Sequence, residues 1–176
     1  IKRSADVVLA LFILLLALPI LCCAALAIRI ADTGPVLFRQ VRIGRNNQAF
    51  TLLKRRSMVV GAEQQVIDLR DWNQRHGPLF KMSSDPRVTP VGRVLRITSI
   101  DELPQLLNVI AGHMSLVGPR PALPTEVMNF DRELQLRHSV RPGITGLWQV
   151  AGRDDPSFEL YRRLDLFYVQ HWSIAL

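Results

Sequence analysis

Two acidic residues stand side by side in a chain that is otherwise rich in arginine. Asp101 and Glu102 are consecutive, and their neighbours along the chain include Arg87, Arg93, Arg96 and Arg120, with Arg141 further on. Carboxylates beside guanidinium groups suit metal-assisted phosphoryl transfer, in which Mg²⁺ bridges a carboxylate and a diphosphate. The pattern predicts Asp101 as nucleophile or base, with Glu102 orienting it or binding the metal.

A structural explanation of the same pair is open on the residues alone. Ser99 and Glu102 have the spacing of a capping box, and acidic residues favour the first turn of a helix. An apolar stripe follows, and Gly112 is expected to end that helix.

Two further groups of cations could bind phosphate. Arg120 lies between Pro119 and Pro121, and such rigid presentation suits bidentate contact with a phosphate. The run Lys54-Arg55-Arg56 follows a predicted strand, where it could bind phosphate or simply protect a solvated strand edge. The four histidines lack ligand spacing, so no zinc site is expected.

The elements that must position these residues predict an α+β fold that is predominantly helical. Strands are expected at Val36–Ile43 and Phe50–Leu53, joined by a turn at 44–47 into a small β-hairpin. A short helix or a turn is expected at Val91–Ile97. Helices are expected at Ala62–His76, from Ser99 onward, at Thr125–Ser139 and at Phe158–Trp172. The last mixes aromatic and basic residues, which suits a membrane interface or a core-facing helix.

An apolar segment, Val7–Ile28, precedes all of these elements. As a straight helix it would reach about 33 Å, enough to cross a bilayer core of about 30 Å. Pro19 predicts a kink near its middle, and basic residues flank both ends. Since positive residues mark the cytoplasmic side, the segment could enter and leave by one face, although a kinked transmembrane helix fits too.

The bulk properties limit the classes of function. The net charge of +7 suits an anionic membrane or a phosphorylated substrate, whereas nucleic acid ranks last because the charges sit beside an apolar anchor. Cys22 and Cys23 form neither a disulfide framework nor a metal-ligand pattern. We expect a membrane helix at residues 1–30 and one catalytic domain at 31–176. The chain starts at Ile1 and stops within an amphipathic run, which is typical of a trimmed domain.

Four sequence blocks together resemble one protein family. They are DPRVT at 85–89, LRITSIDELPQ at 95–105, MSLVGPRP at 114–121 and RPGITGLWQV at 141–150. In this order they resemble the bacterial sugar transferases, which are monotopic phosphoglycosyl transferases. The resemblance covers nearly the whole chain. It departs at Arg55, where the family usually has an aromatic or aliphatic residue.

The resemblance implies a specific reaction. Such enzymes transfer a sugar-1-phosphate from a UDP-sugar to a polyprenyl (undecaprenyl) phosphate and release UMP. Their acidic dyad falls on Asp101 and Glu102, so Asp101 would form an aspartyl-phosphosugar intermediate. Both residues would bind Mg²⁺. The substrate-binding cations would be Lys54, Arg56, Arg87, Arg96, Arg120 and Arg141. Two successive displacements predict ping-pong kinetics.

The resemblance also implies a cellular setting. The N-terminal helix would be re-entrant and broken near Pro19, in the bacterial inner membrane, with the catalytic domain on the cytoplasmic face. The product would initiate exopolysaccharide, capsule or O-antigen assembly. Trp148 favours a plain hexose such as galactose or glucose, and homodimer formation stays open. The alternative function is a membrane-tethered basic scaffold, which would need the arginines but not the carboxylates.

Overall fold

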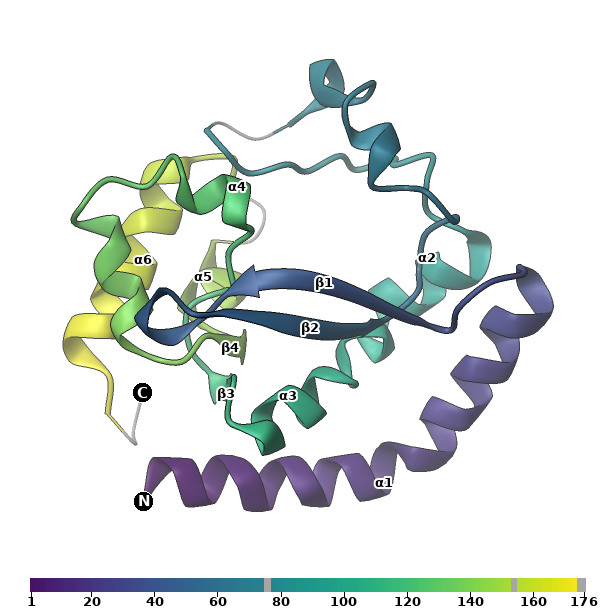
Figure 1. Cartoon of the computed structure of the whole chain (residues 1–176), viewed down its shortest axis with the longest axis horizontal. Coiled ribbons are helices and arrows are strands. Elements are labelled where there is room, and N and C mark those ends of the chain that lie inside the picture. Colours follow the sequence, from purple (N-terminus) through teal and green to yellow (C-terminus); the bar gives the residue numbers. More distant parts are fainter. Residues whose placement is uncertain (75–76, 153–154, 174–176) are drawn as a thin grey trace.

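The computed structural model describes residues 1–74, 77–152 and 155–173 (Figure 1). Its α-helices are α1 (Lys2–Ala31), α2 (Pro90–Ile97), α3 (Gln105–Ala111), α4 (Pro124–Val127), α5 (Leu147–Ala151) and α6 (Phe158–His171). Its strands are β1 (Leu37–Ile43), β2 (Ala49–Arg55), β3 (Ser115–Val117) and β4 (Gly143–Thr145). The 3₁₀ turns are η1 (Arg45–Asn47), η2 (Gln64–Val66), η3 (Arg70–Trp72), η4 (Ile100–Glu102) and η5 (Leu134–Ser139).

The predicted β-hairpin is confirmed. Strands β1 and β2 pair antiparallel from Leu37 opposite Arg55 to Ile43 opposite Ala49. The connection bends through Asn46 and Asn47, whose φ values are +55° and +59°. Asparagine tolerates this left-handed region better than most residues, so the sequence suits a tight reversal.

A second strand pair was not predicted. Strands β3 and β4 pair in parallel, with Ser115 opposite Gly143 and Val117 opposite Thr145. The two backbones approach so closely that a Cβ on Gly143 would lie 2.1 Å from the backbone nitrogen of Gly118. Glycine is therefore required here for packing between chain segments.

Helix α1 is attached to the rest of the protein along its whole length. It bends partway and passes below α3 before rising beside α2 (Figure 1). Its buried apolar residues, Ala10, Ala17, Leu21, Ala24 and Ile28, form one narrow stripe of mostly small side chains. The helix contains Pro19, which removes one backbone hydrogen bond and accounts for a bend. Among the described residues this is the helix long and apolar enough to cross a membrane.

Three apolar clusters form the core. One lies under α5 and α6 and includes Phe130, Trp148 and Tyr161. A second joins α1, β2 and α3 through Ala10, Leu52 and Val109, and a third joins α1 to α2. Helix α1 therefore belongs to two of the three clusters.

Two of the predicted helices are wrong. The segment predicted as helix Ala62–His76 forms turns with η2 and η3, and residues 75–76 lie outside the described part. Its large apolar side chains Ile67 and Trp72 are exposed, and among its described residues only the small Ala62, at its start, is buried, so little tertiary burial stabilises a helix there. The segment predicted as helix Thr125–Ser139 divides into α4 and η5, because the Asp131 carboxylate accepts the backbone N–H of Leu134 and starts a new turn.

The C-terminal helix is confirmed as α6 and lies against the core. Tyr161, Leu166 and Tyr168 are buried, whereas Phe167 is exposed. The core-facing alternative therefore explains its aromatic residues, and an interfacial position remains a prediction.

Candidate active site

Asp101 lies in the turn η4, between α2 and α3. The capping box predicted at Ser99 is wrong, because Ser99 has φ +57° and its side chain caps no helix nitrogen. A left-handed conformation is uncommon for a residue other than glycine and is costly, and such strain often occurs at functional sites. The strained residue turns the chain so that Asp101 is only 5% exposed.

Glu102 reaches a cation from the hairpin. Its Oε1 accepts a hydrogen bond from Lys54 Nζ at 2.7 Å, and the two side chains are 35% and 27% exposed. An ion pair that is about one-third exposed to solvent contributes little stability. Its consequence is positional, because it fixes the end of β2 against the turn that carries Asp101.

Burial raises the pKa of Asp101 above its ordinary value. The positive charge of Lys54 acts in the opposite direction, Glu102 reinforces the increase, and Arg96 opposes it. A buried carboxylate with a raised pKa is less solvated and more basic than an exposed one. This suits a nucleophile or a base.

Arg96 extends the cationic side of this site. Its Nε donates to Ser57 Oγ at 2.9 Å. Helix α2 approaches that segment so closely that a Cβ on Gly92 would lie 1.9 Å from the carbonyl oxygen of Ser57. Gly92 therefore allows the close contact that brings Arg96 beside the acidic turn.

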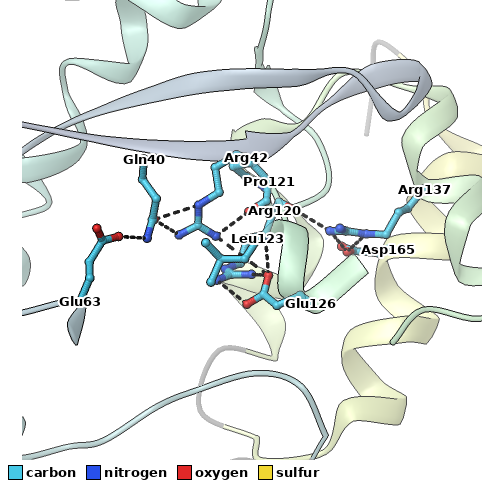
Figure 2. A network of polar contacts seen from close by, with 9 residues as sticks. All are labelled: Gln40, Arg42, Glu63, Arg120, Pro121, Leu123, Glu126, Arg137 and Asp165. Atoms are coloured by element: carbon cyan, nitrogen blue, oxygen red, sulfur yellow. Dashed lines mark hydrogen bonds and ion pairs between the residues drawn. The ribbon is translucent and has the colours of Figure 1, made fainter. Parts of the chain in front are cut away.

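A second charged cluster begins on β1 and continues into the loop after β3 (Figure 2). Arg120 donates from Nη1 and Nη2 to the Glu126 carboxylate at 2.9 and 3.2 Å. Arg42 donates to the carbonyl of Pro121 at 3.0 Å and lies 4.0 Å from the same carboxylate. Burial and the neighbouring Arg120 lower the pKa of Arg42. The negative charge of Glu102 acts in the opposite direction and raises it. The charge of Glu102 thus acts on the second cluster, whose ion-pair partner is Glu126 rather than the acidic turn itself.

The loop that carries Arg120 is held from behind. Arg137 donates to Asp165 through Nε at 3.0 Å and Nη2 at 2.6 Å, and also to the carbonyl of Arg120 at 2.5 Å. Arg42, Arg120 and Arg137 face two carboxylates, Glu126 and Asp165. Each guanidinium stays charged at neutral pH, so these five groups carry a net charge of +1 that favours an anion.

The structure brings together four of the predicted residues and places three elsewhere. One turn carries Asp101 and Glu102, and Lys54 and Arg96 lie beside it. Arg120 lies in the second charged cluster. Arg56 binds the carbonyls of Asp32 and Thr33 and the Asp32 carboxylate, Arg87 binds Asp85 and the carbonyl of Ala62, and Arg141 binds the carbonyl of Gly112. These contacts hold loops and turns, and substrate binding by these three remains a prediction.

Sequence reasoning missed Arg42. It lies opposite Phe50, on the same face of the hairpin as Lys54, because side chains alternate along strands. The hairpin register, once assigned, is the signal that would have found it.

A magnesium ion fits the acidic turn by its donor chemistry. Among the described residues no group of three or more histidine, cysteine or acidic side chains could hold a metal. Mg²⁺ is usually bound through one or two carboxylates together with substrate phosphates and water. Asp101 and Glu102 could supply such carboxylates, with Glu102 partly open to solvent.

Comparison with known proteins identifies the class. The family model of the bacterial sugar transferases matches residues 1–176, and the chain belongs to this family. The exopolysaccharide production protein ExoY of Rhizobium meliloti (strain 1021) is 41% identical over 177 residues, which are 98% of this chain and 78% of that protein.

Two other relatives are longer. The galactosyl transferase CpsE of Streptococcus agalactiae serotype III (strain NEM316) is 48% identical over 144 residues, 81% of this chain and 32% of CpsE. The UDP-glucose:undecaprenyl-phosphate glucose-1-phosphate transferase of Escherichia coli (strain K12) is 42% identical over 181 residues, 98% of this chain and 37% of that enzyme. The chain thus spans about a third of each.

Proposed function

We propose that this chain transfers a sugar-1-phosphate from a UDP-sugar to a polyprenyl phosphate such as undecaprenyl phosphate, releasing UMP. The observation that carries the proposal is a buried carboxylate, Asp101, beside Glu102 and within electrostatic reach of the cations Lys54 and Arg96. The Escherichia coli relative is named for this reaction with glucose. The product would initiate assembly of an exopolysaccharide, capsule or O-antigen-type glycan.

The first half-reaction uses Asp101 as the nucleophile. One of its carboxylate oxygens attacks the β-phosphorus of the donor, the bond from that phosphorus to UMP breaks, and UMP leaves with the electron pair. Lys54 and Arg96 are placed to stabilise the added negative charge, as cations aimed at a reacting phosphate do. Arg120 and Arg42 of the second charged cluster would hold the donor diphosphate.

The second half-reaction regenerates the carboxylate. A phosphate oxygen of the polyprenyl phosphate attacks the phosphorus of the aspartyl-phosphosugar, and the bond to Asp101 breaks. Bound Mg²⁺, held by Asp101 or Glu102, would neutralise charge on the diphosphate. Covalent catalysis of this kind requires that UMP release precede acceptor binding.

The decisive experiment measures UMP release by the detergent-solubilised chain from a panel of UDP-hexoses, with Mg²⁺ and with or without undecaprenyl phosphate. Asp101→Asn should abolish release, because an amide is a poor nucleophile, while membrane binding remains. Glu133→Gln, an exposed acid outside the site, is the matched control. Normal turnover by Asp101→Asn would exclude the nucleophile assignment. Membrane binding without turnover by the wild type with any donor would favour the basic scaffold instead.

The attachments of α1 support a re-entrant helix with both ends on the cytoplasmic side. Near its start, Arg3 donates to the carbonyls of Val109 and Ile110 at 2.6 and 3.0 Å. Near its end, Ile28 packs with Leu95 of α2. A helix that crossed the bilayer would place its ends on opposite sides of a core about 30 Å thick, where one small domain could not contact both.

Cysteine labelling tests this topology. In a chain with Cys22 and Cys23 replaced by alanine, single cysteines at Ser4 and Thr33 should react from the same side of a sealed vesicle. Pro19→Leu should shift the helix toward crossing. Labelling of the two positions from opposite sides in the Pro19 protein would exclude the re-entrant helix.

A further inference from the structure

An open groove of about 720 Å³ lies beside the C-terminal half of α1. Its apolar walls are Ala25 on α1 and the segment Val36, Leu37 and Phe38 at the start of β1. Arg39 and Arg55 also line it. The groove thus combines a hydrocarbon-like wall with two guanidinium groups.

Arg55 has an unsatisfied polar atom in this position. Its Nη2 donates to the carbonyl of Leu21 at 2.9 Å, whereas its buried Nε has no hydrogen-bond partner. Burial lowers the pKa of Arg55. A partly buried cation with an unsatisfied donor is costly, so an anion beside the guanidinium would gain from its charge.

The two arginines lack counter-charges among the residues that the structure describes. Among the ion pairs of the described residues, none joins Arg39 or Arg55 to a carboxylate, although the other basic residues of the hairpin end, Lys54 and Arg56, each have one. The charge therefore serves something other than the dyad, which pairs with the opposite face of β2 through Lys54.

The location of the groove selects the chemistry of its occupant. The carbonyl that Arg55 contacts belongs to Leu21, within the apolar helix, and the neighbouring Leu18, Leu26 and Ile30 are exposed. Basic pockets beside membrane helices bind anionic lipid head groups, whose phosphate accepts charge-assisted hydrogen bonds. An apolar wall next to that cation accommodates an acyl chain.

We propose that this groove binds one anionic phospholipid, with the lipid phosphate on Arg55 and Arg39 and an acyl chain along Ala25, Val36 and Leu37. The lipid fills the space between α1 and the hairpin and supplies a negative charge beside Arg39 and Arg55. This site lies apart from the acidic turn, and the proposal requires only that α1 associate with a membrane.

Native mass spectrometry of the whole chain tests the proposal without any measurement of turnover. The detergent-solubilised protein is incubated with equal amounts of phosphatidylglycerol and phosphatidylcholine, and retained lipids are counted. The wild type should retain one phosphatidylglycerol. Arg55→Leu should weaken that retention about tenfold, since a hydrogen bond to a charged group is worth roughly that factor or more. Arg55→Lys should retain most of it because the charge remains.

Two further variants make the result decisive. Arg132→Leu removes an exposed arginine outside the groove and should bind lipid as the wild type does. Ala25→Phe fills the groove with Arg55 intact and should also lose the lipid. This variant tests the groove even where the Arg55 variants fold poorly.

Three outcomes would overturn the proposal. The first is equal retention by the wild type, Arg55→Leu and Ala25→Phe. The second is no preference for phosphatidylglycerol over phosphatidylcholine. The third is displacement by equimolar undecaprenyl phosphate or by millimolar inorganic phosphate, which would identify an acceptor site or a simple anion site.

Discussion

Replacing Asp165 by asparagine should destabilise the protein strongly and disturb the loop that carries Arg120. Asp165 and Arg137 are 2% and 1% exposed, so water screens neither charge. The substitution preserves shape but leaves Arg137 as a buried cation without a counter-charge. Breaking a buried ion pair from one side costs about 3–5 kcal/mol. For a chain of this size, roughly 10 °C would be lost from the midpoint of thermal unfolding.

The assay is thermal unfolding in detergent, followed by circular dichroism, with Glu133→Gln as the control. Glu133 pairs with Arg162 at the surface, where ion pairs contribute little, so its midpoint should match the wild type. Because Arg137 also binds the backbone carbonyl of Arg120, the KM for the donor should rise in Asp165→Asn at temperatures where the protein is folded. A midpoint within 2 °C of the wild type would refute the reasoning about the buried pair.

Three other predictions concern the site and its supports. Lys54→Met removes a charge that lowers the pKa of Asp101, so the acid limb of the kcat/KM profile should move to higher pH, and an unchanged limb would contradict the electrostatic role. Arg120 and its other partners outweigh burial and lower the pKa of Glu126 in the folded state, so the wild type should lose stability as pH falls below about 4.3, the ordinary value for glutamate. Glu126→Gln should show a flatter dependence of unfolding free energy on acid pH, and an equally steep one would exclude that contribution. Gly143→Ala should cost about 1–3 kcal/mol in denaturant unfolding because its Cβ would overlap backbone atoms, and wild-type stability would show that the strand pair can separate at no cost.

Local sequence patterns predicted elements that carry their own signals. The alternation around 36–43 and 50–53 was sufficient for the hairpin, and the run Val91–Ile97 for α2, whose N-cap Thr89 accepts the N–H of Gly92. Helix Ala62–His76 failed because amphipathic periodicity does not reveal whether a partner surface exists. The pair β3–β4 joins segments about 28 residues apart, and no local pattern encodes that contact.

The candidate site shows the same limit. Asp101 and Glu102 were found from residue type and adjacency, but the reason for their placement was misassigned, since a left-handed Ser99 replaces the expected helix cap. Arginines are alike in sequence, whereas the structure distinguishes them by partner. Arg87 closes a loop through Asp85, and Arg42, unnoticed in the sequence, joins the cluster around Glu126.

The two-cluster membership of α1 has a practical consequence for producing this protein in water. Cutting the chain after Ala31 would remove Ala10, Ala24 and Ile28 from the interior and leave Leu52, Val109 and Leu95 facing solvent. A soluble version is therefore better sought by redesign than by truncation. Polar side chains on the outward face, at positions such as Leu11, Leu15 and Leu26, would make the helix soluble in water. Its buried stripe would still cover the core of the remaining domain.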